Sequence, residues 1–346
     1  MTSTRTEGID VASVTAWFER HVTGVRPPLR FDVVAGGHSN LTYRVEDNAG
    51  QRFVLRRPPL GELAASAHDM EREHRIMGAL GPSAVPVPEM VGYCAEPTVT
   101  GAPFYVMRWV DGLVLRDAAS VGRVDEATRR AAAESLIDTL AGLHAVEPDA
   151  VGLGDLGRRD GYVERLIRRW RRQWDTGRRR ELPLIEEVGD RLAAAIPEAG
   201  PARIVHGDYR LDNVIIDPGD GAVRAVLDWE LCTLGDPLAD VGMLMVYWTE
   251  PGDLVPALLV NPTAEPGFPG RKEIADRYAA VSGRDLGDLD YYVALGTWKV
   301  AVILEGVYNR YAAGAYGDTD GAWRRFDDII PALAERAHEI ARQAGR

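Results

Sequence analysis

The sequence predicts an α+β fold in two parts, a small antiparallel sheet with one helix followed by a larger, mostly helical region. Short alternating apolar runs, separated by Gly, Asn and Asp, fill the first 110 residues. From Asp125 onward apolar residues recur at helical spacing, interrupted by two short strands within Ile204 to Glu230. We therefore predict one domain over residues 1–110 and a second over residues 111–346.

The first part contains a helix, a strand block and a second helix. Asp10 to Val22 predicts an amphipathic helix with Asp10 as its N-cap, and apolar spacing over Ala67 to Leu80 predicts another. Pro86 and Pro88 end any helix before the last strands. Two alternating runs predict strands at Leu29–Ala35 and Leu41–Glu46, and three further short apolar runs predict strands at Arg52–Arg56, Met90–Tyr93 and Phe104–Val110.

The second part is predicted to be mostly helix. Its two strands are Val214–Ile216 and Val223–Leu227, and Gly252–Gly270 is predicted to be a surface loop because it is rich in Pro and Gly. Helical spacing marks Glu126–His144, Gly161–Trp174, Ile185–Ile196, Pro237–Trp248, Arg271–Ser282, Leu289–Ala313 and Ala322–Ala344.

Composition is that of a soluble globular enzyme, with 46% hydrophobic and 27% charged residues. The net charge of -12 argues against nucleic-acid binding. No apolar run approaches the roughly 18 residues that span a bilayer, and the first residues lack a signal-peptide pattern. Cys94 and Cys232 are far apart, which favours a reducing, cytoplasmic location. The oligomeric state is left open.

The stretch from Ile204 to Glu230 carries the strongest chemical signal. Its Asp208, Asn213 and Asp228 stand in loops that flank the two strands. Phosphoryl transfer needs a carboxylate near the acceptor hydroxyl and oxygen ligands for Mg²⁺, and the spacing H-x-D-x-x-x-x-N followed by a later Asp supplies both. Turn capping would explain each residue singly. The joint spacing favours the catalytic interpretation.

VHGDYRLDN and VLDWELCTLGDPLADVG resemble motifs of the aminoglycoside phosphotransferase / choline kinase-like family. These are small-molecule kinases with a bilobal protein-kinase-like fold, and the resemblance covers about Phe31 to Tyr311. FVLRRPP, MEREHRIM and ILEGVYNRY resemble the branch with kinase-like domains fused to acyl-CoA dehydrogenases. The resemblance implies a nucleotide-binding N-lobe and a C-lobe that holds the catalytic loop and substrate site.

The resemblance also implies roles for the residues of the motif. Asp208 would be the catalytic base, and Asn213 and Asp228 would be Mg²⁺ ligands. His206 would order the loop and Asp240 would brace it. Glu230 is a weaker candidate for the metal site.

The N-terminal block should supply the cover over ATP. Gly36 and Gly37 allow close approach of the backbone to phosphate, and Ser39 and Asn40 offer hydrogen bonds. A Gly-Gly between strands is more often a plain turn. On the third strand Arg56 stands where kinases place Lys, and a permanent cation can keep the phosphate role.

Arg56 needs a carboxylate partner on the following helix. Glu73 is the first choice and Glu71 the second, with a solvated helix face as the alternative for Glu73. Arg57 should point to the opposite face of the strand, where we expect a surface charge.

The last predicted strand leads into the hinge between the lobes. By resemblance Met107 lines the adenine pocket, and Arg108 and Val110 offer backbone groups to adenine. Met107 could equally be plain core packing.

Two further features concern the acceptor. Arg158–Arg180 has ten Arg against three acids, which indicates a solvated helix with paired charges or an anion-binding patch. Lys299, Glu305 and Arg310 interrupt an apolar helix, so they either face a substrate cleft or form internal ion pairs. Tyr162, Trp170 and Trp174 have near-helical spacing, which favours core packing over a stacking surface.

The main hypothesis is a kinase that uses ATP and Mg²⁺ to phosphorylate a hydroxyl of a small molecule. The acceptor is open among aminoglycosides, amino alcohols, sugars and hydroxyacyl thioesters, and GTP is not separated from ATP. The alternative is a non-catalytic nucleotide-binding regulator, motivated by Arg56 in place of Lys. A protein kinase ranks lowest because LDWELCTLGDPLADVG leaves little platform for a peptide.

Overall fold

The computed structural model describes residues 7–34, 40–60, 69–253, 262–314 and 321–345. The chain divides into two compact units. The first comprises Met1–Gly112 together with Arg224–Glu230, and the second comprises Leu113–Val223 and Leu231–Arg346. Asp228 therefore belongs to the first unit and Asp208 to the second.

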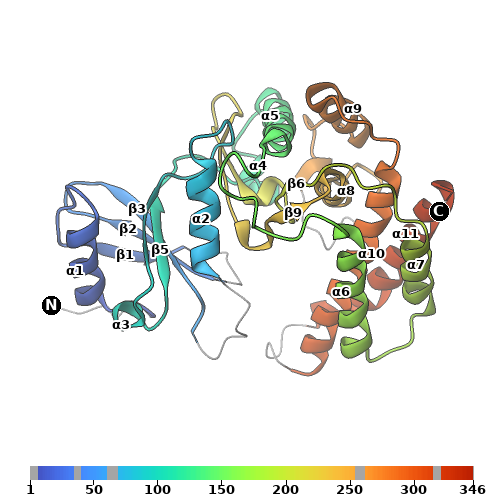
Figure 1. The fold of residues 1–346 in the computed structure, drawn as a ribbon, viewed down its shortest axis with the longest axis horizontal. Helices are drawn as coiled ribbons and strands as arrows, with labels where there is room; N and C mark the ends of the chain where they lie inside the picture. The colour runs from blue at the N-terminus through green and yellow to red at the C-terminus, as the bar shows by residue number, and fades with distance from the viewer. Residues whose placement is uncertain (1–6, 35–39, 61–68, 254–261, 315–320, 346) are drawn as a thin grey trace. The chain divides into compact units, whose positions relative to one another are not determined.

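The first unit is built on a five-stranded antiparallel sheet with strand order β1-β2-β3-β5-β4. Helices α1 and α2 lie on opposite sides of this sheet (Figure 1). The strands are β1 (Arg30–Val33), β2 (Leu41–Glu46), β3 (Arg52–Arg57), β4 (Met90–Cys94) and β5 (Phe104–Arg108). The helices are α1 (Val11–His21), α2 (Met70–Leu80) and the short α3 (Pro97–Thr100).

Helix α1 is held at its N-terminus and along one face. The Asp10 carboxylate accepts a hydrogen bond from the Ser13 amide at 2.7 Å, which confirms the predicted N-cap. Trp17 and Phe18 of α1 are buried and make edge-to-face contacts with Phe104 and Phe53, at ring-centroid distances of 5.0 and 5.5 Å. These contacts fix the sheet on which Arg56 stands.

Arg57 corrects a prediction. It points to the opposite face from Arg56, as strand alternation requires, but it is buried rather than a surface charge. Its guanidinium donates to the backbone carbonyls of Gly8 and Thr100. Arg57 can be buried there because its guanidinium N–H groups donate to two backbone carbonyls, one in the segment before α1 and one at the C-terminal end of α3.

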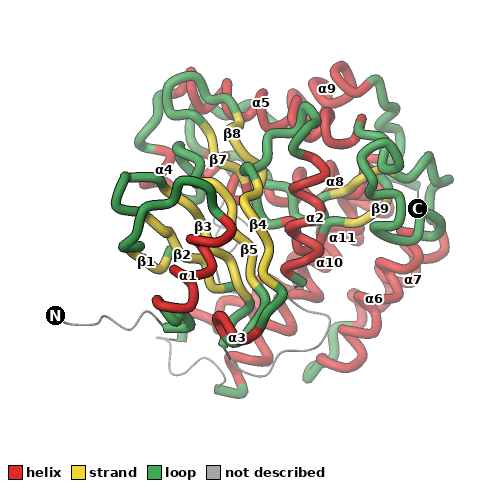
Figure 2. The backbone as a smooth tube through the Cα atoms, turned by 60° about the vertical axis from the view of Figure 1, so that its left-hand side comes forward, coloured by secondary structure: helices red, strands yellow, loops and turns green. Residues whose placement is uncertain are grey.

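The second unit is mostly helical, and together the two units confirm the predicted α+β class (Figure 2). Strands β6 (Arg203–Val205) and β9 (Thr233–Gly235) pair in antiparallel fashion, and β7 (Val214–Ile216) also belongs to this unit. Strand β8 (Val223–Val226) has only its first residue in the second unit, because Arg224–Glu230 belongs to the first. The helices are α4 (Ala118–Val121), α5 (Glu126–Ala145), α6 (Tyr162–Gly177), α7 (Pro183–Ala194), α8 (Pro237–Tyr247), α9 (Arg271–Ser282), α10 (Leu289–Ala312) and α11 (Phe326–Gln343).

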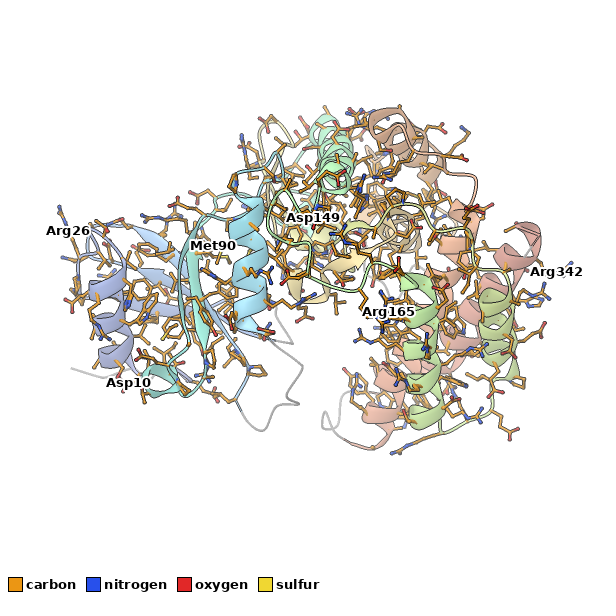
Figure 3. The ribbon with its side chains drawn as sticks, in the orientation of Figure 1. Asp10, Arg26, Met90, Asp149, Arg165 and Arg342 are labelled. Carbon is orange, nitrogen blue, oxygen red and sulfur yellow. The ribbon has the colours of Figure 1, made fainter. Side chains whose placement is uncertain are left out.

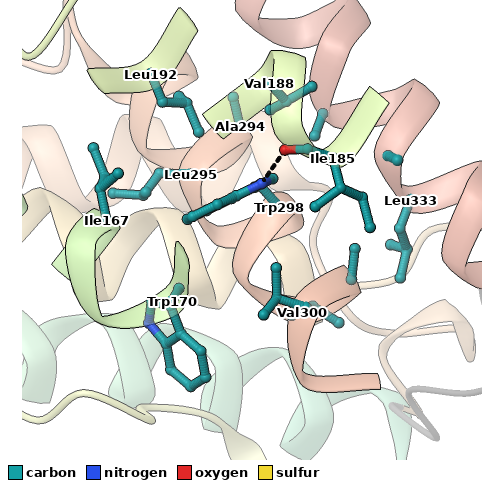
Figure 4. Close-up of a cluster of buried hydrophobic side chains, with 14 of the residues drawn as sticks. Ile167, Trp170, Ile185, Val188, Leu192, Ala294, Leu295, Trp298, Val300 and Leu333 are labelled. Carbon is teal, nitrogen blue, oxygen red and sulfur yellow. Dashed lines mark hydrogen bonds between the residues drawn. The ribbon is translucent and has the colours of Figure 1, made fainter. Parts of the chain in front are cut away.

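The core of the second unit lies between α6, α7, α8, α10 and α11. Trp298 of α10 is at its centre and donates from its indole nitrogen to the Ile185 carbonyl at 2.8 Å (Figure 4). Trp170 and Trp174 of α6 are buried in this core, which confirms the core-packing interpretation for both. Among the helices in the described ranges, none combines the length and apolarity that crossing a bilayer requires.

Candidate active site

Arg56 lies in the middle of the first unit's sheet, on β3, opposite Tyr105 of β5. One guanidinium nitrogen, Nη2, is 2.5 Å from Asp228 Oδ1, and Nη1 is 3.5 Å from Glu73 Oε2. The side chain is only 13% exposed. Burial acts to lower the pKa of Arg56, but Tyr105, Glu73 and Asp228 together raise it above its usual range. The guanidinium thus stays charged and bridges two carboxylates.

Glu73 is the partner that α2 presents to Arg56, whereas Glu71 is exposed. Glu73 is 1% exposed, and its Oε2 accepts a hydrogen bond from the Tyr105 hydroxyl at 3.0 Å. Burial raises the pKa of Glu73 to about 7, although Arg56 and the Tyr105 hydrogen bond act to lower it. A carboxyl group in this environment changes charge near neutral pH.

The Glu73 carboxyl should make folding stability depend on pH around neutrality. Because its folded pKa lies above its unfolded pKa, its stabilising contribution is complete in acid and is lost as the pH rises through about 7. Urea unfolding of the wild type and of Glu73→Gln across this range should show the wild type losing stability relative to the variant as pH increases. Parallel pH profiles for the two proteins would contradict the raised pKa.

Asp228 has a backbone φ of 65°, in the left-handed region that non-glycine residues rarely adopt. Its segment is anchored on both sides of it. The Val226 amide donates to the Pro86 carbonyl at 2.8 Å, and the fully buried Trp229 donates from its indole to the Val226 carbonyl at 3.0 Å. Such strained residues persist where their surroundings hold them, and they concentrate at functional sites. Glu230, half-buried, acts to raise the pKa of Glu73.

The predicted phosphate cover is described only in part. Gly36, Gly37 and Ser39 lie outside the described residues. Asn40, immediately before β2, is 5% exposed, and its side-chain amide has no hydrogen-bond partner among the described residues. A buried amide in this state is unusual in a folded protein, and a ligand is one way to satisfy it.

The predicted adenine-binding residues lie along β5 and just beyond it. Met107 is 7% exposed, and the Arg108 guanidinium lies 4.7 Å from the centroid of the Phe53 ring. The Arg108 amide donates to the Glu89 carbonyl at 2.8 Å, so it is already paired in the sheet. Val110 is half-buried in the segment that follows β5.

In the second unit, Asp240 of α8 holds the turn that precedes Asp208. The backbone amides of His206 and Gly207 donate to its two carboxylate oxygens at 2.6 and 2.8 Å. Gly207 has a φ of 86°, and a Cβ there would meet Leu231 at 2.8 Å, so only glycine fits. Burial acts to raise the pKa of Asp240, but the hydrogen bond and charge of His144, the charge of His206 and the Gly207 amide bring it below its usual range.

A buried chain of hydrogen bonds continues behind Asp240. His144 Nε2 lies 3.3 Å from Asp240 Oδ2, and His144 Nδ1 lies 2.7 Å from the Tyr278 hydroxyl. His144, Asp240 and Tyr278 are each at most 1% exposed. Nothing in the sequence marks His144 or Tyr278, because each looks like an ordinary residue of an amphipathic helix.

Asn213 lies beside Asp208 on the loop that follows β6. Its Nδ2 donates to the Asp208 carbonyl at 2.8 Å and to Asp208 Oδ2 at 3.0 Å. The Asp208 amide donates to His206 Nδ1 at 3.3 Å. The Arg210 guanidinium lies 3.6 Å from Asp208 Oδ2 and stacks at 4.8 Å on the ring of Tyr247. The Asp208 carboxylate is therefore oriented, yet remains 24% exposed.

Lys299, Glu305 and Arg310 of α10 have different surroundings. Lys299 is 7% exposed, with Nζ 3.4 Å from the Gly207 carbonyl and 5.6 Å from the Trp170 ring centroid. Burial lowers the pKa of Lys299, although Asp208 and Asp240 act to raise it. Glu305 is buried and accepts from Arg180 Nε at 2.9 Å, whereas Arg310 is exposed. Of the three, Lys299 is the one that contacts the turn before Asp208.

Several arginines of the Arg-rich segment have partners within the protein. Arg165, labelled on α6 in Figure 3, donates to the backbone carbonyls of Arg158 and Asp160. Further ion pairs join Arg171 to Asp190, Arg178 to Glu186, and Arg180 to Glu305 and Asp327. These contacts favour the paired-charge interpretation over an open anion-binding patch.

The oxygen donors of Asn213 and Asp228 suit Mg²⁺. Both nitrogen bonds of the Asn213 amide go to Asp208, which leaves Oδ1 as the end able to bind a cation. Asp228 uses Oδ1 for Arg56. The described residues contain no group of three or more His, Cys, Asp or Glu side chains able to hold a metal ion. Mg²⁺ does not need such a group, because it is usually bound through one or two protein ligands plus substrate phosphates.

Comparison with solved structures defines the class of the fold. An aminoglycoside phosphotransferase APH(4)-Ia, in a ternary complex with AMP-PNP and hygromycin B, superposes with a TM-score of 0.61 at 18% identity, over 96% of this chain and 98% of that one. A Ralstonia eutropha protein provisionally assigned as an aminoglycoside phosphotransferase superposes with a TM-score of 0.81 at 34% identity, over 96% of this chain and 98% of that one. The fold is that of the kinase-like phosphotransferases.

The family follows from sequence. The model of the phosphotransferase enzyme family matches residues 31–277, and the chain belongs to this family. It is 34% identical to acyl-CoA dehydrogenase family member 11 of Gallus gallus over 89% of this chain, and 33% identical to family member 10 of Mus musculus over 94%. It spans only 40% and 30% of those two proteins. The predicted family and branch are thus confirmed.

Proposed function

We propose that the chain is an ATP- and Mg²⁺-dependent kinase that transfers the γ-phosphate to a hydroxyl of a small molecule. One observation carries this proposal. The Asp208 carboxylate is accessible and oriented by Asn213, on a turn whose two amides are fixed by the buried Asp240. A base held in this way suits proton transfer from an alcohol.

The proposed step forms a bond between the acceptor oxygen and the γ-phosphorus and breaks the bond from that phosphorus to the β,γ-bridging oxygen. ADP leaves, and the hydroxyl proton passes to Asp208. Asn213 and Asp228 would hold Mg²⁺, which neutralises charge on the phosphates when bound. His206 orders the loop by accepting the Asp208 amide hydrogen bond.

The nucleotide is proposed to bind the N-lobe, residues 1–110. Arg56 would bind the phosphates, with Gly36, Gly37, Ser39 and Asn40 as the cover. Met107, Arg108 and Val110 would contact adenine. Residues 111–346 would carry the acceptor site, with Lys299 nearest to the catalytic turn and Glu305 and Arg310 more distant candidates. The candidate acceptors are the four classes named from the sequence, which are aminoglycosides, amino alcohols, sugars and hydroxyacyl thioesters.

Arg56→Lys tests whether ATP binding needs the two separate nitrogens of the Arg56 guanidinium or only its positive charge. Lysine keeps the charge, but its single ammonium cannot reach Asp228 and Glu73 with separate nitrogens as Arg56 does. We expect the KM for ATP to rise about tenfold, a loss of about 1.4 kcal/mol, with a smaller change in kcat. Steady-state kinetics at saturating acceptor measures this. Unchanged constants would show that charge alone is sufficient.

A non-catalytic nucleotide-binding regulator is the second candidate. The contact that favours it is the Arg56–Asp228 ion pair at 2.5 Å, which engages a proposed metal ligand. A nucleotide and Mg²⁺ would have to compete with that pair. If the pair persists with nucleotide bound, the chain would bind ATP without turning it over.

Release of ADP from Mg-ATP separates the two candidates. The panel should contain aminoglycosides, choline, sugars and hydroxyacyl-CoA thioesters, with the Asp208→Ala variant as the blank. Stimulation by one class, absent in the variant, supports the kinase and identifies the acceptor class. Tight ATP binding with no stimulation by any class supports the regulator.

A further inference from the structure

A buried tyrosine hydroxyl lies at the centre of the first unit, next to the charged groups of the proposed nucleotide site. Tyr105 is 0% exposed and stands on β5 directly opposite Arg56 of β3. Its hydroxyl donates to Glu73 Oε2 at 3.0 Å. The sequence marks Tyr105 only as one more residue of an apolar strand.

The Glu73 carboxyl has few polar contacts apart from this one. Its Oε2 also receives Arg56 Nη1 at 3.5 Å, a long contact for a hydrogen bond. Its Oε1 is buried without a hydrogen-bond partner among the described residues. The shortest contact that fixes the carboxyl is therefore the one from Tyr105.

Arg56 in turn depends on two carboxylates. Nη2 is bound to Asp228, and Nη1 faces Glu73. If Asp228 binds the metal of the nucleotide, its bond to Arg56 is weakened or lost. Glu73 is then the carboxylate that still positions Arg56. A carboxyl that is free to rotate would hold Arg56 less firmly, because a flexible side chain must be ordered again on binding.

We propose that Tyr105 is a positioning residue that holds Glu73 in the orientation from which Glu73 fixes Arg56 for the nucleotide phosphates. This inference rests on the proposed function, because it requires that Arg56 binds phosphate. Tyr105 itself touches neither nucleotide nor acceptor in this account. It acts through Glu73.

Tyr105→Phe removes the hydroxyl and keeps the ring. Tyr43→Phe is its matched control, since Tyr43 is equally buried in the same sheet and donates to the Glu7 carbonyl at 2.6 Å, while the described residues show no hydrogen bond from its hydroxyl to Glu73 or Arg56. We expect both variants to show similar losses in melting temperature. Only Tyr105→Phe should raise the Kd for AMP-PNP and the KM for ATP, about five- to tenfold, with a smaller change in kcat.

A double-mutant cycle with Glu73→Ala adds a readout that a merely structural role would not move. In the Glu73→Ala background, Tyr105→Phe should leave the Kd for AMP-PNP unchanged, because no acceptor is left at position 73 for the Tyr105 hydroxyl to hold. Equal Kd values for the wild type and Tyr105→Phe, an equal effect of Tyr43→Phe, or additive effects in the cycle would overturn the proposal. AMP-PNP binding is independent of turnover. If the wild type binds AMP-PNP but transfers no phosphate, the kinase assignment is wrong, and the Kd comparison still tests the role of Tyr105.

Discussion

Replacing Asp208 by Ala should lower kcat about a thousandfold while the affinity for ATP stays close to that of the wild type. The reason is that Asp208 faces the acceptor hydroxyl in the proposed reaction, whereas the nucleotide contacts are assigned to the first unit. Acceptor-dependent ADP release gives kcat, and calorimetric titration with AMP-PNP gives the affinity.

Asp212→Ala is the matched control for this loss. Asp208 and Asp212 are on the same loop, are 24% and 23% exposed, and both contact the Arg210 guanidinium. Only Asp208 is oriented by the Asn213 amide. Asp212→Ala should therefore keep most of the turnover. Equal activity in the two variants would show that Asp208 is not the base.

Asp240→Asn should be the second most damaging change, acting on both stability and turnover. The wild-type carboxylate accepts two amide hydrogen bonds, whereas an Asn side chain has one carbonyl oxygen and would turn its NH₂ toward one of the donors. We expect a loss of about 3 kcal/mol of unfolding free energy, because a buried amide is left unpaired and a charged acceptor is removed. Turnover should fall at least tenfold because the turn before Asp208 loosens.

Asp236→Asn controls for the charge change on the same helix. Asp236 is the N-cap of α8 and accepts from the Leu238 amide at 2.9 Å, and its Oδ2 accepts from the Tyr292 hydroxyl at 2.7 Å. An Asn can keep the first bond through its oxygen and can turn its NH₂ toward the hydroxyl oxygen, which is also able to accept. Its loss of stability should therefore be smaller than that of Asp240→Asn. Chemical unfolding of both variants, with kinetics of the surviving enzyme, makes the comparison. Similar losses of unfolding free energy in the two variants would contradict the claim that the Asp240 carboxylate holds the turn before Asp208.

The Asp240 effect should also depend on pH. Because the folded pKa of Asp240 lies below its unfolded value, its contribution is complete at neutral pH and is lost as the pH falls through the folded pKa. The difference in unfolding free energy between the wild type and Asp240→Asn should therefore shrink in acid. A difference that stays constant down to the acid-unfolding range would contradict this.

The sequence predicted the longer elements well, because their signals are local. β2 follows strict alternation over Leu41–Glu46, and Arg271–Ser282 lies between two glycines that mark the ends of α9. The short elements were missed. β6 and β9 have three residues each and pair across a long separation in the chain, so no local pattern reveals them. The C-terminal helix begins at Phe326 rather than Ala322, because a 3₁₀ turn precedes it.

The candidate site was predictable where a motif marks it, and otherwise it was not. Asp208, Asn213 and Asp228 stand in a motif whose spacing reflects their chemistry. Tyr105 and His144 act through partners on distant segments, and their importance depends on tertiary placement alone. Arg57 was wrongly predicted to be a surface charge. Alternation predicts which face of the strand Arg57 points to, but it does not reveal that backbone carbonyls on that face accept hydrogen bonds from a buried guanidinium.

The most direct test of the central claim is the fate of the γ-phosphate. The chain would be incubated with γ-³²P-labelled ATP, Mg²⁺ and a small-molecule metabolite extract, beside the Asp208→Ala variant. The account predicts a labelled small molecule whose label a phosphomonoesterase removes, formed by the wild type and absent with Asp208→Ala. Label found only in inorganic phosphate or on protein, at a rate that Asp208→Ala does not change, would contradict the account.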